Sequence, residues 1–106
     1  SGFESLNDMP TARPQTKYKT KEVDGRYYIE VSLKNTSSRI AFFTQLQFLD
    51  KAGKPVRPSF YTDNFFSLLP GETKQVLIDT SVDKVTEGEF SLTVGGWNVQ
   101  QKKYKL

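Results

Sequence analysis

The fold of this chain is decided by the stretch Tyr61-Thr-Asp-Asn-Phe-Phe-Ser-Leu-Leu-Pro-Gly-Glu72. The stretch begins with Tyr61 and three polar residues, and the pair Pro70-Gly71 lies near its end. Pro70 fixes φ at the second position of a tight turn, and Gly71 supplies the positive φ that the third position needs. Bulky apolar residues lie between the two ends. We therefore expect this stretch to cross between two sheets, with its aromatic side chains filling the core beneath it.

The segments on both sides of this stretch alternate polar and apolar residues, as strands with one buried face do. The clearest alternation runs over residues 27–34, and Asp24-Gly25 before it is a hairpin turn signal. In the segment 40–49 the residues expected to share the inward face are Ile40, Phe42, Leu46 and Phe48, with Thr44 among them. In the segment 73–79 we expect Val76 and Ile78 to point inward.

Further strands are expected over residues 15–23, 90–94 and 97–104, and Tyr18 and Val23 are the expected inward residues of the first. Apolar residues do not recur at helical spacing over three turns. Six or seven short strands with turn signals between them predict an all-β fold. We expect an immunoglobulin-like antiparallel β-sandwich of about seven strands over residues 15–106.

Residues 1–14 contain Pro10 and Pro14 and show no periodicity, so we expect them to form a linker or an N-terminal arm. The length of 106 residues suits one domain. No apolar run approaches the roughly 20 residues of a membrane span, so we expect no membrane partner.

The composition argues against chemistry within this chain. It contains no cysteine and no histidine, which excludes disulfides and removes the commonest general base and metal ligand. Glycoside hydrolysis needs two facing carboxyl groups, but the acidic residues are scattered along the chain. We therefore expect no catalytic residue, no metal and no cofactor.

The chain has 15 lysines and arginines against 12 acidic residues, a net charge of +3, and its lysines fall mainly in two segments. They could bind phosphates or an anionic polymer, or they could cover the solvent face of edge strands and discourage edge-to-edge pairing. We favour edge strands and expect no nucleic-acid partner. The lysines concerned are Lys17, Lys19, Lys21, Lys102, Lys103 and Lys105.

The loop that begins at Asn35 matches the N-glycosylation pattern in Asn35-Thr36-Ser37. Asparagine and serine are also ordinary turn residues, because their side chains bond to nearby backbone. We favour turn chemistry over a glycan.

Aromatic residues are the remaining candidates for binding. Phe60, Tyr61, Phe65, Phe66 and Trp97 could form a platform for sugars or a patch for a neighbouring domain. Because aromatic side chains of a small sandwich must largely go inside, we expect Phe65 and Trp97 to fill the core. For Tyr61 and Phe66 both interpretations stay open.

Three segments together resemble a known family: Asn35-Thr-Ser-Ser-Arg-Ile-Ala-Phe-Phe43, Asp63-Asn-Phe-Phe-Ser-Leu-Leu-Pro-Gly-Glu72 and Gly96-Trp-Asn98. They look like the C-terminal immunoglobulin-like domain of glycoside hydrolase family 2 enzymes, in the exo-β-glucosaminidase and β-mannosidase branch. The resemblance covers residues 15–106, and the Asp-Asn-aromatic segment joined to Leu-Pro-Gly-Glu is its most specific part.

The resemblance implies a non-catalytic accessory domain with a scaffolding role. In that family a separate barrel domain carries the paired catalytic glutamates, so no catalytic residue is carried over to this chain. The implied partners are the catalytic barrel and the neighbouring sandwiches of the same parent enzyme. A periplasmic or secreted parent is favoured.

The alternative is a carbohydrate-binding module that uses exposed aromatic residues to hold an oligosaccharide. Asp63 and Asn64 match the family's motif and are expected to build the turn. The candidate contacts to sugar or to a neighbouring domain are Tyr61, Asp63, Asn64, Phe66 and Trp97.

Overall fold

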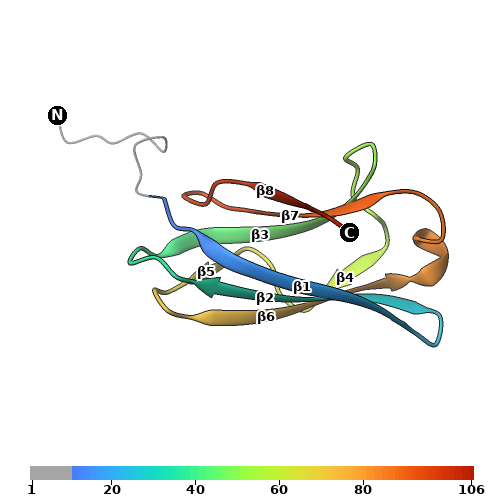
Figure 1. Cartoon of the computed structure of the whole chain (residues 1–106), viewed down its shortest axis with the longest axis horizontal. Helices are drawn as coiled ribbons and strands as arrows, with labels where there is room; N and C mark the ends of the chain where they lie inside the picture. The colour runs from blue at the N-terminus through green and yellow to red at the C-terminus, as the bar shows by residue number, and fades with distance from the viewer. Residues whose placement is uncertain (1–10) are drawn as a thin grey trace.

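The computed structural model describes residues 11–106 as two four-stranded antiparallel sheets packed face to face (Figure 1). The predicted all-β immunoglobulin-like sandwich is confirmed, with eight strands instead of about seven. The strands are β1 (Pro14–Val23), β2 (Arg26–Asn35), β3 (Ala41–Asp50), β4 (Ser59–Tyr61), β5 (Phe66–Leu68), β6 (Thr73–Ser81), β7 (Phe90–Gly95) and β8 (Lys102–Lys105).

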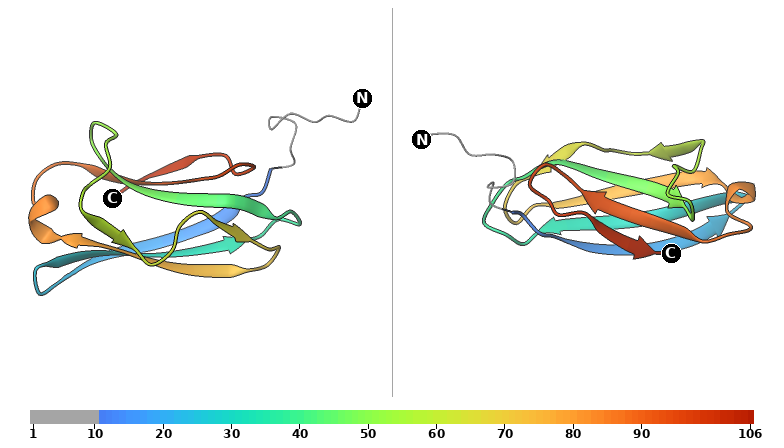
Figure 2. Two further views of the ribbon diagram at one scale, coloured as in Figure 1. Left: turned by 180° about the vertical axis from the view of Figure 1, so that it is seen from behind. Right: turned by 90° about the horizontal axis from the view of Figure 1, so that it is seen from above.

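The strand order is β1-β2-β6-β4 in the first sheet and β5-β3-β7-β8 in the second. Strands β1 and β8 are both sheet edges, as their lysines predict, and Figure 2 shows them along the same side of the sandwich. The rings of Tyr18 and Tyr104 lie 5.5 Å apart, centroid to centroid, and join these two edges. No helix within residues 11–106 is long and apolar enough to cross a membrane.

The hairpin predicted at Asp24-Gly25 is confirmed. Val23 pairs with Arg26, so the turn has two residues, and both have positive φ, 49° for Asp24 and 80° for Gly25. This geometry matches the right-handed twist of the paired strands. The alternation in β2 is also confirmed, because its buried side chains are those of Ile29, Val31, Leu33 and the terminal Asn35.

The stretch 61–72 crosses between the sheets, as predicted. It leaves the first sheet at the end of β4, joins the second sheet as β5, and returns to the first sheet at the start of β6. Gly71 has a φ of 80°, and the N–H of Glu72 donates to the carbonyl of Leu69 at 3.0 Å. The chain therefore turns at Pro70-Gly71 in the way the residue types require.

The prediction that Phe65 and Trp97 fill the core is wrong. Their exposed fractions are 61% and 56%. The core is mostly aliphatic, with Phe48 as its largest fully buried side chain, and Leu68 is the residue of the crossing stretch that is fully buried. A core made of branched aliphatic side chains leaves little room for more rings.

Strand β3 departs from simple alternation at a bulge. The residues that face the core are Ala41, Thr44, Leu46 and Phe48, whereas Phe42 is only half-buried and not fully inward as expected. The pairing with β5 changes register between Ala41 and Thr44. An extra residue in one strand reverses the sides on which the following side chains lie.

Two other expectations differ from the structure. Val23 and Tyr18 are exposed, because they lie in an edge strand at the open side of the sandwich. Trp97 and Val99 precede the last strand, which begins only at Lys102. The strand missed in the sequence is β5, whose three residues are too few to show a period.

The predicted arm over residues 1–14 lies mostly outside the described residues. Within the described part, Ala12 is buried and its N–H donates to the carbonyl of Asn98 at 2.8 Å. Pro14 begins β1.

The Asn35 loop follows turn chemistry. The amide nitrogen of Asn35 donates to the carbonyls of Arg39 at 2.6 Å and Leu68 at 2.9 Å, and its oxygen accepts from the Ser37 N–H at 3.1 Å. Because this side chain is fully buried, its nitrogen is not accessible to a glycan in the folded chain.

Candidate functional site

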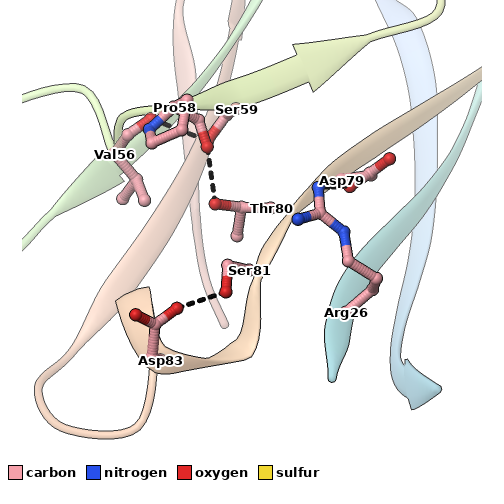
Figure 3. A network of polar contacts seen from close by, with 8 residues as sticks. All are labelled: Arg26, Val56, Pro58, Ser59, Asp79, Thr80, Ser81 and Asp83. Carbon is pink, nitrogen blue, oxygen red and sulfur yellow. Dashed lines mark hydrogen bonds and ion pairs between the residues drawn. The ribbon is translucent and has the colours of Figure 1, made fainter. Parts of the chain in front are cut away.

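The acidic side chains near β6 are used in structural contacts. Asp79 pairs with Arg26 of β2, and the hydroxyl of Ser81 donates to the carboxylate of Asp83 (Figure 3). Nowhere in residues 11–106 do three or more acidic, histidine or cysteine side chains come together as a metal site would require. These acids therefore stabilise turns and strand pairs.

Asp63 and Asn64, both predicted site residues, lie in the crossing stretch. The Asp63 carboxylate accepts from the Lys74 ammonium at 2.6 Å and from the Asn64 N–H at 2.8 Å. These two hydrogen bonds, that of Lys74 first, hold the pKa of Asp63 below its ordinary value. The Asn64 oxygen accepts from the Leu46 N–H at 2.8 Å, and its nitrogen donates to the Leu46 carbonyl at 2.9 Å. Both side chains thus bind the chain itself.

Tyr61 and Phe66 are turned toward the interior. The Tyr61 hydroxyl accepts from the Phe48 N–H at 2.8 Å, and burial raises the pKa of this phenol. Phe66 is half-buried against the core, and the Lys74 ammonium lies 5.5 Å from its ring centroid. Both rings thus contribute contacts within the chain.

Trp97 belongs to a different group of side chains on the outer face of the second sheet. Phe43, Phe65 and Trp97 line a groove of about 480 Å³, and the rings of Phe43 and Trp97 lie 4.8 Å apart at 59°. Their exposed fractions are 47%, 61% and 56%. We call this hollow the aromatic groove. The polar side chains that complete it are Gln45, Gln47, Thr93 and Gln101, and none of the residues 11–106 that line it is charged.

The bulge in β3 turns Phe43 outward. Asn98 holds the bulge from one side: its oxygen accepts from the Phe42 N–H at 2.8 Å and its nitrogen donates to the Ile40 carbonyl at 2.7 Å. The N–H of Trp97 donates to the Phe42 carbonyl at 3.1 Å. The same asparagine segment therefore fixes both rings, Phe43 and Trp97, in contact.

A glycine allows this close approach of two backbone segments. A Cβ added to Gly96 would lie 2.7 Å from the Phe42 carbonyl oxygen, closer than real Cβ atoms come. The expectation that Gly95-Gly96 permits a bulge or a close backbone approach is confirmed, with Gly96 as the residue that needs it.

Two phenylalanines of the groove have a left-handed backbone. The φ of Phe43 is 49° and that of Phe65 is 56°. For a bulky residue this conformation costs about 1–3 kcal/mol and persists only where surrounding contacts impose it. For Phe65 the contact is made by Asn64, whose side-chain oxygen accepts from the Phe65 N–H at 3.1 Å.

Phe43 was missed as a site residue and Phe65 was expected to fill the core, although the sequence contains a signal for both. Each belongs to a pair of adjacent phenylalanines, Phe42-Phe43 and Phe65-Phe66. Neighbouring residues of a strand point to opposite faces of the sheet, so one ring of each pair must face outward. The paired phenylalanines indicate that one ring is exposed, whereas the folded backbone determines which of the two it is.

A wider depression of about 720 Å³ lies over the outer face of the first sheet. Glu30 in its lining pairs with Lys19 of the lining at 3.2 Å and with Lys21, outside the lining, at 2.9 Å. Exposed pairs of this kind contribute little to stability or binding. The aromatic groove is therefore the stronger candidate for a functional surface.

Comparison with known proteins identifies the family. A model of the "exo-beta-D-glucosaminidase Ig-fold domain" matches residues 1–99. The chain belongs to this family. Among curated proteins, the exo-β-D-glucosaminidase of Arthroderma benhamiae is 40% identical over 81 residues, which are 76% of this chain and 9% of that protein. The exo-β-D-glucosaminidase of Amycolatopsis orientalis is 39% identical over 77 residues, 71% of this chain and 8% of that protein.

A mannosidase relative and a solved structure support the same family assignment. The mannosylglycoprotein endo-β-mannosidase of Lilium longiflorum is 35% identical over 85 residues, 72% of this chain and 8% of that protein. The crystal structure of Amycolatopsis orientalis exo-chitosanase CsxA matches with a TM-score of 0.84 at 30% identity, over 95% of this chain and 12% of that chain. The chain thus corresponds to the non-catalytic Ig-fold portion, about a tenth, of such glycoside hydrolases.

Proposed function

We propose that this chain is an accessory domain of a family 2 glycoside hydrolase that acts on β-linked glucosamine or a related β-mannoside. Its role is to support the fold of the parent enzyme around the catalytic domain, without touching the reacting bond. The observation that carries the proposal is the match over 95% of this chain to only 12% of an exo-chitosanase chain.

The distribution of carboxyl groups supports a role outside the chemistry. Retaining glycosidases place two carboxyl groups about 5–5.5 Å apart, and inverting ones about 6.5–9.5 Å apart, across a cleft. Here Asp63, Asp79 and Glu30 pair with cations, each at a different part of the surface. Glu87 and Glu89 flank a glycine in an exposed loop.

The second candidate function is carbohydrate binding, and the exposure of Trp97 beside Phe43 is the observation that favours it. Three features count against it. The two rings are inclined at 59° and do not form a flat row, and the groove offers no carboxylate to the amino group of a glucosamine unit. A net charge of +3 also repels a cationic polymer.

The proposal is tested in the full-length protein that contains this chain. We expect Glu87→Gln and Glu89→Gln, which alter the two exposed acids that flank Gly88, to leave kcat on an aryl β-glucosaminide unchanged. Deletion of the whole chain is expected to shorten the half-life of the enzyme at elevated temperature, because packing surface on its neighbours is lost.

Two results would contradict the accessory role. One is a loss of turnover of about 100-fold or more in either glutamine variant, since removal of a catalytic carboxyl has effects of that size or larger. The other is a deletion that leaves yield, half-life and turnover all unchanged.

A further inference from the structure

We propose that the aromatic groove is the surface by which this chain docks onto another domain of its own parent protein. The proposal rests on the accessory role proposed above and assigns that role to a defined face of the molecule. The docking face consists of the outer side of strands β3 and β7 where Phe43, Phe65 and Trp97 meet.

The composition of the groove is that of the centre of a protein interface. Such centres are rich in aromatic residues and poor in charged ones, and tryptophan is among the residues that contribute most to binding. In this groove three exposed rings stand beside glutamine and threonine side chains, and the part of the chain that the structure describes places no charged residue in its lining. The depression on the opposite sheet is instead lined by lysines and Glu30.

Two of these rings belong to residues whose backbone has a conformation that is unfavourable for bulky side chains. Three non-glycine residues among those described have positive φ, and two of them are Phe43 and Phe65. The third, Asp24, lies in a hairpin turn that requires this conformation. Hydrogen bonds within the chain maintain this conformation, yet both phenylalanine rings point away from the core, as is expected if the rings serve contacts outside this chain.

The backbone of the aromatic groove is also preorganised for binding. Asn98 and Asn64 hold the two backbone segments through side-chain hydrogen bonds of 2.7 to 2.9 Å to Ile40, Phe42 and Leu46. Rings fixed in this way lose little conformational freedom on binding, which favours association.

The occupant is a domain of the same chain, because most of the protein to which such a domain belongs lies outside these residues. The match covers 12% of the exo-chitosanase chain, so the remaining part of a comparable parent offers extensive surface. A sugar is disfavoured by the 59° inclination of the Phe43 and Trp97 rings, since stacking on a pyranose needs a flat face.

The experiment compares Phe65→Ser and Trp97→Ala with a matched control, Phe60→Ser. Phe60 and Phe65 have the same exposed fraction, 61%, but Phe60 pairs with Asp79 in the first sheet, away from the groove. Each substitution is made both in the 106-residue chain and in the full-length protein. The melting temperature of the short chain and the half-life of thermal inactivation of the long one are measured.

We expect Phe65→Ser and Phe60→Ser to leave the melting temperature of the short chain unchanged, since both rings are mostly exposed. We expect Trp97→Ala to lower it slightly, because the contact of Trp97 with the Phe43 ring is lost. In the full-length protein we expect Phe65→Ser and Trp97→Ala to shorten the half-life about fivefold or more, and Phe60→Ser to leave it unchanged. The proposal is overturned if the groove variants behave like the control in the full-length protein.

Other occupants give different results, which also overturn the proposal. If the first ten residues of this chain fill the groove, Phe65→Ser lowers the melting temperature of the short chain, and deletion of residues 1–10 abolishes that effect. If a sugar fills it, the short chain binds glucosamine or mannose oligosaccharides by calorimetry and Trp97→Ala removes the heat. If deletion of the whole chain destabilises the enzyme but the groove variants do not, the accessory role stands and only the docking face is wrong.

Discussion

At the scale of single residues, asparagine side chains replace missing strand pairing in this domain. Asn98 satisfies a donor and an acceptor of the bulged segment at Phe42 and Ile40, and Asn64 does the same for Leu46. An amide side chain offers both a donor and an acceptor, as a peptide unit does, which makes it suited to this task. These residues thereby determine where neighbouring aromatic side chains point.

We predict that Asn98→Ala lowers the free energy of unfolding by about 2 kcal/mol or more, because the Phe42 N–H and the Ile40 carbonyl lose their buried partner. The measurement is urea unfolding followed by circular dichroism. Gln100→Ala is the control, since Gln100 is exposed and lies two residues away. An equal effect of the two substitutions would show that the Asn98 bonds contribute no net stability.

At the scale of elements, strand β3 and the segment after β7 are built to fit each other. The bulge at Phe42 and Phe43 brings a carbonyl against Gly96, whose position leaves no space for a side chain. The period of β3 changes there, so that Ala41 and Thr44 both face inward. The alternation of polar and apolar residues does not reveal this bulge in the sequence. The side chain that holds the bulge, Asn98, lies 56 residues further along the chain than Phe42.

Gly96→Ala is expected to destabilise the chain by about 1–3 kcal/mol, because its Cβ would overlap the Phe42 carbonyl oxygen and push the two segments apart. Gly95→Ala is the matched control: there the nearest atoms, at 3.3 to 3.5 Å, belong to Gln101 and include its flexible side chain. Melting temperatures of the two variants give the comparison. If Gly95→Ala costs as much as Gly96→Ala, the close approach is not the cause.

At the scale of the whole molecule, the two outer faces differ in chemistry. One carries paired charges such as Glu30 with Lys19 and Lys21, and the other carries the uncharged aromatic groove. Much of this architecture could be predicted, since turn residues at Asp24-Gly25 and Pro70-Gly71 and the alternation in β2 and β6 act locally. The outward rings could not, because contacts between distant segments decide which ring of each pair is exposed.

The molecule as a whole is expected to lose stability in acid. Charge-assisted hydrogen bonds lower the pKa of Glu30, chiefly from Lys21 and then Lys19, and that of Asp63, chiefly from Lys74. A carboxyl group with a lower pKa in the folded than in the unfolded chain stabilises the fold above its unfolded pKa. This contribution is lost as the pH falls through the folded pKa, below the ordinary values of 4.5 and 3.8.

Asp63→Asn tests this expectation, because it removes the charge but keeps an oxygen for the Asn64 N–H. Urea midpoints are measured at about pH 5 and about pH 3. The difference between the two midpoints should be smaller in the variant than in the unsubstituted chain. An unchanged difference would mean that the contact with Lys74 does not contribute to acid sensitivity.

The outward position of Trp97 has a practical consequence for spectroscopy. It is the single tryptophan of the chain, so nearly all emission excited at long wavelength comes from a side chain that water already reaches. Denaturation will therefore shift the fluorescence maximum only slightly, whereas anything that covers this indole will move it to shorter wavelength. The tryptophan fluorescence of this domain therefore reports on what covers Trp97 and not on the packing of the core.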